Sequence, residues 1–490
     1  MGSFNPANVS LPYSHYIGGE SFDSGTKMAV LRPSDGQAYA DVALADLDLV
    51  DRAVDNAWQA YKQSDWAKKS PRDRAKAMLR WADLIVADKE NLAPLEALGS
   101  TRPIAAVKQW DIPFCAEGIR FFAEYADKLG GEVIPTDHGH LGMTITEPYG
   151  VIGAIAPWNF PLVMASWKIA PAMAAGNAVV LKPSEMTPFS VVRLAELAIA
   201  AGIPAGIFNV IQGDGKVGDA LCRHPLISKV TFTGSTKTGA LIMSACAQSG
   251  TKPVTLELGG KSPQLVFDDV KDLDKVAQRI AAAITTNSGQ VCVAGSRLLV
   301  QEGIAEQLVS RITERFDDMV AGPTWQTSST LSPIISSREL ARIEGVVQGA
   351  IKQGGELLTG GQSVAVDGAN SFYKPTILQQ VDMSMDVVRE EIFGPVLCVE
   401  TFATDEDALQ LASHPSYGLS AGVHTADLNR AMRMVRELEA GTVWVNRYGR
   451  SWDFAIPTGG FKSSGIGKDL GRYAYEANQK TKSVLIDLGA

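Results

Sequence analysis

Short apolar runs alternate with longer amphipathic stretches through the first half of the chain. An amphipathic helix is predicted from Ser70, which can cap it, and another over 187–201, which ends before Gly202. Such alternation is typical of a parallel sheet covered by helices on both faces, so the pattern predicts a doubly wound α/β domain. The apolar, β-branched runs predicted as buried strands are 150–157, 177–183, 207–213, 229–234 and 253–258.

The same pattern restarts after about residue 260 and predicts a second α/β domain. A helix over roughly 272–284 precedes a loop that contains Cys292. Near the C-terminus, 482–488 is apolar and β-prone, and such an edge pairs either within the chain or with another subunit. The strands predicted for the second domain are 296–301, 395–402, 419–425 and 442–446.

Composition and charge exclude several classes of protein. With 490 residues, 46% apolar and 20% charged, the chain is long enough for two or three folded domains. Its net charge of −9 is spread without a basic block, so we expect no nucleic-acid partner. No apolar run approaches the roughly 18–20 residues that span a bilayer, and we expect no membrane partner. Because the N-terminal stretch lacks the pattern of a secretory signal, we expect a cytoplasmic protein.

The cysteines and histidines do not predict a metal site or a disulfide framework. The five cysteines are widely spaced and lack a CxxC pair, which favours reduced thiols. His138 and His140 form the only close histidine pair, and no third ligand is evident. Cys292, in the segment TTNSGQVCVAGSR (285–297), is either a core thiol or a nucleophile on a tight turn.

Two glycine-containing segments are candidates for a phosphate site. GDGKVG (213–218) has the GxGxxG spacing of a dinucleotide-binding loop, but the acidic residue that should follow about 20 positions later is absent from 229–241. A plain strand-to-helix turn is therefore at least as good an interpretation. In FTGSTKTG (232–239) a strand ends and a helix begins, so free N–H groups there could hold a pyrophosphate. Lys182 and Glu185 follow another strand and could hydrogen-bond to two ribose hydroxyls. An ordinary Pro/Ser turn is an equal alternative for this segment.

Seven ordered motifs give the chain a resemblance to a known family. From about residue 15 to the end, it resembles the NAD(P)-dependent aldehyde dehydrogenases. The resemblance implies an α/β fold with a Rossmann-type NAD-binding domain (1–125 and 149–255), an α/β catalytic domain (256–460) and a small β oligomerisation extension (126–148 and 461–490). The motifs are APWNFP (156–161), KPSE (182–185), FTGS (232–235), LELGGKSP (256–263), GQVCVAGSR (289–297), EEIFGP (390–395) and PTGGFKSSGIGKDLG (457–471).

The resemblance implies oxidation of a small-molecule aldehyde to the carboxylic acid. Cys292 would be the nucleophile that forms a thiohemiacetal and then a thioester, which Glu257 would help water to hydrolyse. The amide of Asn159, with the Cys292 backbone N–H, would form the oxyanion hole. Lys168 and Asp469 match proton-relay positions, although most relatives have the longer Glu at the latter. A CoA-acylating enzyme and a non-catalytic member of the fold are the alternatives, and Glu257 and the intact catalytic set argue against them.

The resemblance also implies a dinucleotide site and a preference for NAD. Trp158 and Lys182 would line the adenosine ribose, and GDGKVG would pack near adenine. Glu185 would accept hydrogen bonds from a free ribose 2′-hydroxyl and repel a 2′-phosphate, so NADP is possible but less preferred. The implied cofactor residues are Trp158, Lys182, Ser184, Glu185, Gly215, Gly234, Ser235, Leu258, Glu391 and Phe393.

The substrate pocket is less well defined by sequence. Thr285 and Thr286 stand where many relatives carry aromatic rings, which suggests a wider or more polar mouth. Arg447 or Arg450 could hold the distal carboxylate of a semialdehyde, but subunit or surface salt bridges are the favoured interpretation. Trp452 would equally suit an aromatic aldehyde. Self-association as a dimer or tetramer is implied. The implied tunnel residues are Phe114, Phe160, Val163, Met164, Trp167, Val291, Val293, Arg447 and Trp452, with the rest of 447–458.

Overall fold

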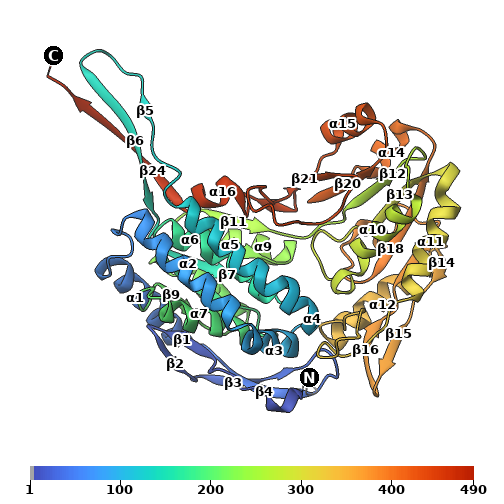
Figure 1. Ribbon diagram of the computed structural model, residues 1–490, viewed down its shortest axis with the longest axis horizontal. Helices are drawn as coiled ribbons and strands as arrows, with labels where there is room; N and C mark the ends of the chain where they lie inside the picture. The colour runs from blue at the N-terminus through green and yellow to red at the C-terminus, as the bar shows by residue number, and fades with distance from the viewer. Residues whose placement is uncertain (1–4, 490) are drawn as a thin grey trace.

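The computed structural model describes residues 5–489 and contains two large sheets (Figure 1). The first sheet has the order β2-β1-β9-β8-β7-β10-β11-β23. Its central strands, β9 to β11, are parallel, and this confirms the predicted doubly wound arrangement. The strands are β1 (His15–Ile17), β2 (Glu20–Phe22), β7 (Val151–Ile155), β8 (Ala178–Lys182), β9 (Phe208–Val210), β10 (Ile227–Thr233), β11 (Val254–Glu257) and β23 (Gly465–Ile466).

Helices cover both faces of this sheet. On one face α6 contacts β7 and β8, and α2, α5 and α7 pack around it, while α1, α8 and α9 contact the sheet from the other side. The α2 helix begins as predicted, because the Ser70 side chain accepts from the Asp73 N–H. These helices are α1 (Leu47–Gln63), α2 (Pro71–Ala87), α5 (Ile112–Tyr125), α6 (Pro161–Ala174), α7 (Ser190–Ala200), α8 (Gly215–Arg223) and α9 (Thr236–Gln248).

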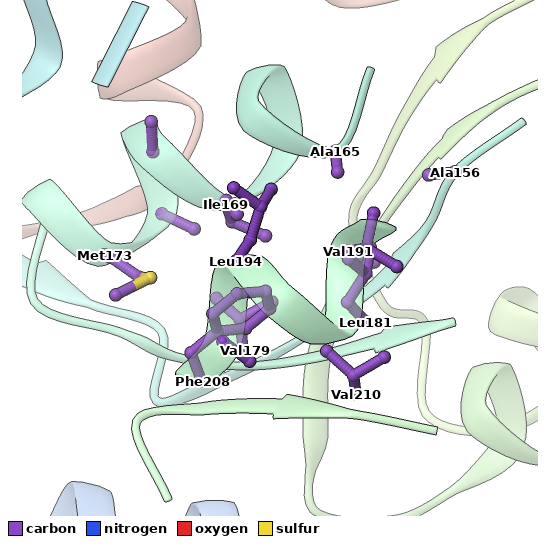
Figure 2. Close-up of a cluster of buried hydrophobic side chains, with 14 of the residues drawn as sticks. Ala156, Ala165, Ile169, Met173, Val179, Leu181, Val191, Leu194, Phe208 and Val210 are labelled. Atoms are coloured by element: carbon purple, nitrogen blue, oxygen red, sulfur yellow. The ribbon is translucent and has the colours of Figure 1, made fainter. Parts of the chain in front are cut away.

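Apolar side chains fill the layer between the first sheet and the helices α6 and α7. Figure 2 shows Ile169 of α6 and Leu194 of α7 above Val179 and Phe208 of the sheet. All four are 2% exposed or less. Burying an aliphatic or aromatic side chain of this size contributes roughly 1.5–3 kcal/mol, so this layer holds the carboxyl ends of β7 and β8 in place.

The second sheet has the order β14-β17-β18-β13-β12-β20-β21 and is parallel apart from the β14–β17 pair. The sequence pattern predicted β13, β18, β20 and β21, but it missed β12, which lies between β13 and β20. The strands are β12 (Pro263–Val266), β13 (Arg297–Gln301), β14 (Glu356–Thr359), β17 (Thr376–Gln379), β18 (Val396–Phe402), β20 (Ser420–His424) and β21 (Thr442–Val445); the helices around them are α10 (Leu273–Thr285), α11 (Ala305–Asp317), α12 (Ser337–Lys352), α13 (Asp386–Arg389), α14 (Asp405–Ala412) and α15 (Leu428–Glu437).

A narrow antiparallel sheet projects from the body as an arm (Figure 1). It consists of β5 (Val133–Ile134), β6 (His140–Pro148) and β24 (Gln479–Asp487), with β24 paired along the whole of β6. The predicted C-terminal strand therefore pairs within its own chain. Of the segment 461–490, β22 (Phe461–Lys462) and β23 pair instead with strands of the body, so β24 is the part that projects.

The smaller elements complete the chain. None of the helices in residues 5–489 has the length and apolar character needed to cross a membrane. These remaining elements are the hairpins β3 (Thr26–Leu31) with β4 (Ala38–Leu44) and β15 (Ser363–Val366) with β16 (Ala369–Tyr373), the strand β19 (Tyr417–Gly418), and the helices α3 (Lys89–Gly99), α4 (Ile104–Ala106) and α16 (Gly471–Glu476).

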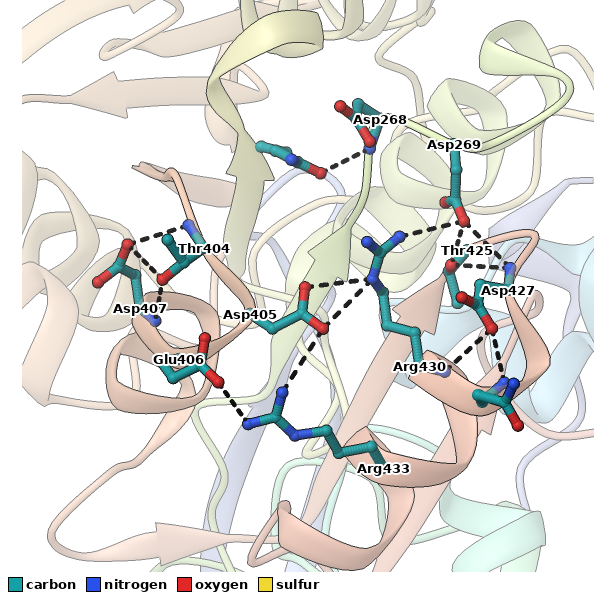
Figure 3. A network of polar contacts seen from close by, with 12 residues as sticks. Asp268, Asp269, Thr404, Asp405, Glu406, Asp407, Thr425, Asp427, Arg430 and Arg433 are labelled. Carbon is teal, nitrogen blue, oxygen red and sulfur yellow. Dashed lines mark hydrogen bonds and ion pairs between the residues drawn. The ribbon is translucent and has the colours of Figure 1, made fainter.

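Two kinds of ion pair stabilise the second sheet and its helices. Figure 3 shows a partly exposed network in which Arg430 of α15 pairs with Asp269 and Asp405, at 3.1 Å each. A second pair is fully buried: Arg297 of β13 donates to Glu400 Oε2 of β18 from Nε at 3.1 Å and from Nη2 at 2.8 Å. Because water cannot replace a lost partner there, removing one member of the buried pair should destabilise the protein more than removing one member of the exposed network.

We expect Glu400→Gln to destabilise the protein by about 3–5 kcal/mol, because Arg297 is left buried without a countercharge. The matched change Glu406→Gln removes an exposed partner of Arg433 and should cost about 1 kcal/mol or less. Thermal unfolding of the two variants measures the difference. Equal melting temperatures would show that the buried pair has no special weight.

Candidate active site

A cavity of about 1070 Å³ opens where residues of the two sheets meet. Its walls include the ends of β10 and β11, the segment after β7, the helices α6, α10 and α12, and the loop around Cys292. The carboxyl ends of parallel strands are where α/β proteins bind ligands, since loops from several strands converge there. Many of the residues singled out by sequence lie in this one cavity.

The turn before Cys292 has an unusual backbone. Asn287, Ser288 and Gly289 have φ of 51°, 52° and 71°, the left-handed region that disfavours residues with a Cβ. A Cβ at Gly289 would also lie 2.1 Å from the Gly394 carbonyl oxygen. Glycine is therefore required at 289 both for its φ and for the close approach.

Hydrogen bonds from other segments hold this turn. The Thr101 hydroxyl donates to Asn287 Oδ1 at 2.7 Å, and the Ser288 hydroxyl donates to the Ser332 carbonyl at 2.5 Å. Gln290 donates from Nε2 to the Pro333 carbonyl at 3.0 Å and accepts the Ile335 N–H on Oε1 at 2.9 Å. No motif predicted these partners, because they come from segments distant in sequence.

Cys292 lies on the cavity wall, whereas the other cysteines are fully buried. Cys292 is therefore not enclosed in the core as the other four cysteines are, and its role as a nucleophile stays a prediction. Burial raises the pKa of the Cys292 thiol to about 12, with the negative charges of Glu391 and Glu257 adding to the rise and the positive charge of Arg450 opposing it. The resting thiol is therefore protonated at neutral pH.

Asn159 lies directly beside the cysteine turn. Its Nδ2 donates to the Gln290 carbonyl at 2.9 Å, and its backbone carbonyl accepts from Asn287 Nδ2 at 3.1 Å. The first of these bonds orients the side-chain amide of Asn159 and uses one of its two N–H groups. The second N–H is available to a negative oxygen formed next to Cys292.

Glu257 ends β11 and is backed by a buried ion pair. Its Oε1 accepts the Asp469 backbone N–H at 3.3 Å, and Asp469 Oδ2 accepts from Lys168 Nζ at 2.5 Å. Burial and then the negative charge of Asp469 raise the pKa of Glu257 well above its usual value, while Lys168, Arg450 and Lys468 act in the opposite direction. Glu257 lines the cavity, whereas Lys168 and Asp469 lie behind it.

Some of the residues predicted to bind a dinucleotide line the cavity, and the others lie outside its lining. Lys182 supports Glu185, since its Nζ donates to the Gly213 carbonyl at 2.5 Å and lies 3.5 Å from Glu185 Oε2. Gly215 begins α8 behind a cap from Asp214, so GDGKVG is a strand-to-helix turn. The predicted residues on the wall are Trp158, Glu185, Gly234, Ser235, Leu258, Glu391 and Phe393, and those outside it are Lys182, Ser184 and Gly215.

Two of these wall residues are fixed by local contacts. Ser235 caps α9 by accepting the Thr238 N–H at 3.2 Å, which directs the positive end of the helix dipole at the cavity. Glu391 accepts the Gly260 N–H at 3.2 Å, and burial raises its pKa to about 7. The sequence did not single out Met186, which also lines this part of the cavity.

The predicted substrate residues are also divided by the structure. Phe114 lies behind the wall, stacked at 4.4 Å between ring centroids on Trp110, which the sequence missed. Arg447 is exposed, and Trp452 is 48% exposed and outside the cavity. Thr285 is buried and donates to the Ala281 carbonyl. The residues on the wall are Phe160, Val163, Met164, Trp167, Val291, Val293 and Thr286.

Tyr448 and Arg450 bring the segment after β21 into the cavity. The Tyr448 hydroxyl donates to the Val293 carbonyl at 2.9 Å, which anchors this segment next to Cys292. The Arg450 guanidinium then lies 5.0 Å from the centroid of the Trp167 ring. Arg450 makes no salt bridge with any residue of 5–489, so no surface ion pair within this part of the chain holds its side chain, and a salt bridge to another subunit stays a prediction.

Comparison with known proteins agrees with the resemblance. The chain is 42% identical to the NADP/NAD-dependent aldehyde dehydrogenase PuuC of Escherichia coli (strain K12) over 90% of this chain and 88% of that protein. It is 38% identical to the cytosolic 10-formyltetrahydrofolate dehydrogenase of Xenopus laevis over 99% of this chain, but spans only 54% of that relative. An indole-3-acetaldehyde dehydrogenase solved with NAD+ superposes with a TM-score of 0.96 at 40% identity, covering 99% of this chain and 98% of the other.

These relatives differ in length and in the substrate that their names give. The chain spans about half the length of the 10-formyltetrahydrofolate dehydrogenases it matches and nearly the whole of the others. Residues 21–484 match the model of the Aldehyde dehydrogenase family, so nearly the whole chain is accounted for. The chain belongs to the aldehyde dehydrogenase family.

Proposed function

We propose that this chain oxidises an aldehyde to the carboxylic acid with NAD. The observation that carries the proposal is a single cavity that holds a cysteine on a rigid turn, an amide beside it and a buried carboxylate, Cys292, Asn159 and Glu257. A thiol, a fixed donor and a base are the groups that acyl chemistry through a thioester requires.

The residues of the cavity fit a dinucleotide. Ser235 places the N-terminus of α9 at the wall, where its free N–H groups suit a pyrophosphate. The Glu185 carboxylate, 36% exposed and held by Lys182, suits the hydroxyls of a ribose. Gly259 leaves room for the Glu391 carboxylate at the cavity wall, because a Cβ at 259 would lie 2.3 Å from Glu391 Oε2. When bound, NAD supplies the hydride acceptor.

In the first half of the reaction Cys292 forms a bond to the aldehyde carbon. Its thiol releases a proton to solvent, the sulfur adds to the carbonyl, and the free N–H of Asn159 stabilises the negative oxygen of the thiohemiacetal. Loss of hydride from the former aldehyde carbon restores the C=O double bond and leaves a thioester on Cys292. The turn at 287–289 keeps the sulfur fixed through both steps.

In the second half Glu257 takes a proton from water, the resulting hydroxide adds to the thioester carbon, and the C–S bond breaks to release the acid and the Cys292 thiolate. The raised pKa of Glu257 makes it a stronger base once it is ionised. Asp469 touches Glu257 through its N–H, and its carboxylate is held by Lys168. This pair offers the proton a route away from the cavity.

We expect Glu257→Gln to keep a burst of about one NADH per active site while steady-state turnover falls by about 10²–10⁴-fold. Acylation of Cys292 does not need the carboxylate, whereas hydrolysis of the thioester does. Stopped-flow absorbance of NADH measures both phases with a simple aldehyde.

Cys292→Ala should abolish the burst and the turnover together. The matched control Glu306→Gln, on the exposed face of α11, should leave both unchanged. Loss of the burst in Glu257→Gln would contradict the role given to Glu257 and place it in acylation.

For cofactor preference, we expect Glu185→Gln to lower the ratio of kcat/KM for NAD to that for NADP by about tenfold. The change keeps the size of the side chain and removes the charge that repels a 2′-phosphate. Steady-state kinetics with each cofactor measures the ratio. If the ratio of kcat/KM for the two cofactors is unchanged, the preference for NAD does not come from the charge of Glu185. Glu306→Gln again serves as the control.

We also infer that the chain self-associates through the arm and that it acts in the cytoplasm. Exposed apolar side chains of the arm favour association, among them Val133 at 75% and Leu485 at 67%. The free thiols of all five cysteines suit a reducing compartment, which cell fractionation would test.

We expect Leu485→Asp to reduce the particle mass measured by light scattering, because it places a charge on the arm. Leu428→Asp makes the same change at a 74% exposed leucine of α15 in the body and should leave the mass unchanged. A Leu485→Asp particle of unaltered mass would rule out the arm as the main contact.

A further inference from the structure

We propose that the preferred substrate is an aldehyde that carries a carboxylate at its far end, and that Arg450 binds this carboxylate. The inference rests on the proposed function and adds the substrate class. It is carried by a cationic side chain that lines the cavity of Cys292, makes no salt bridge with residues 5–489 and has a buried nitrogen without a hydrogen-bond partner.

Arg450 is held in place but is not neutralised. Its guanidinium lies over the Trp167 ring, and the anchored Tyr448 fixes the segment that carries it. Its Nη2 is buried and has no hydrogen-bond partner among residues 5–489. A buried guanidinium without an acceptor is destabilising, so this arrangement favours a ligand that supplies one.

The acidic groups around Arg450 are engaged elsewhere or favour the neutral form. Asp453, on the same loop, accepts from the Ser451 hydroxyl. Asp469 is paired with Lys168. Burial raises the pKa of Glu257, which favours its neutral form, and Glu257 makes no salt bridge with Arg450. Arg450 therefore remains free to pair with an incoming anion.

Arg102, which also lines the cavity, is already paired. It makes a two-point pair with Asp111, at 2.8 and 2.9 Å, and its guanidinium lies 4.4 Å from the Phe160 ring centroid. Among the arginines of the cavity wall, Arg450 is the one with a buried nitrogen that has no hydrogen-bond partner in residues 5–489. Arginine binds carboxylates in the same two-point manner, which would orient the far end of the substrate.

The walls between Arg450 and the cysteine loop suit an apolar connecting group. Trp167, Phe160, Met164 and Val291 face the cavity here and offer rings and methyl groups. The recognised molecule therefore carries an aldehyde group at one end, a carboxylate at the other and an apolar spacer between them. A neutral aldehyde with the same spacer would leave Arg450 without an acceptor.

Matched aldehydes test this assignment. The probes are succinic semialdehyde against butanal, and 4-carboxybenzaldehyde against 4-methylbenzaldehyde, with NADH formation as the readout. In the wild-type protein kcat/KM should be at least about tenfold higher for one or both carboxylated members than for their neutral partners. Arg450→Met should lower kcat/KM for the preferred carboxylated probe about 30-fold more than for its neutral partner, mainly through KM, whereas the loss shared by both probes reports the positive charge removed from Cys292 and Glu257.

Arg450→Lys keeps the charge and should restore part of the preference. Arg447→Met is the matched control, because Arg447 lies three positions away with its side chain outside the cavity. It should leave the ratio between carboxylated and neutral probes unchanged. Thermal unfolding and the burst with a neutral aldehyde show that each variant is folded and competent.

The outcomes separate the inference from the proposed function. If the wild-type protein oxidises the neutral aldehydes but shows no preference for either carboxylated probe, the inference is overturned and the proposed function stands. Equal losses for both members of a pair in Arg450→Met would also overturn it, and would assign Arg450 to the acidity of the Cys292 thiol. If no probe yields NADH, the proposed function fails and the inference fails with it.

Discussion

The left-handed turn at Asn287, Ser288 and Gly289 is the constraint on which the rest of the site depends. Holding non-glycine residues in this region costs about 1–3 kcal/mol each, so the turn persists only because bonds from Thr101 and Ser332 hold it. These partners belong to different parts of the chain. The position of Cys292 therefore depends on the two sheets being correctly assembled, and the sulfur gains a fixed place beside Asn159.

Burial has a second effect, which is to favour the protonated form of the acidic groups of the site. The pKa values of Cys292, Glu257 and Glu391 are all raised, with burial as the largest cause in each. The protonated thiol is a weak nucleophile, so chemistry has to wait until a proton is removed. The positive charges of Lys168 and Arg450 lower the pKa of Glu257 and so oppose the effect of burial on this carboxyl group.

The sequence predicted the parts of the fold that have a local cause. Continuous apolar strands such as β7 and β8 were recognised because both of their faces are buried. The strand β12 was missed, since Pro263–Val266 is short and its neighbours in the sheet, β13 and β20, are distant in sequence. In the site, motifs identified Cys292 and Glu257, but no motif encodes Trp110.

The choice between Arg447 and Arg450 shows why a substrate is harder to predict than a reaction. Both arginines lie on one short segment, and alternation along the chain does not decide which of them faces the cavity. The Tyr448 hydroxyl decides it by binding the Val293 carbonyl, next to Cys292. A contact between distant segments therefore selects the arginine that lines the cavity. Catalytic groups are fixed by motifs and tight turns, whereas the selectivity of this cavity depends on how one divergent loop folds over it.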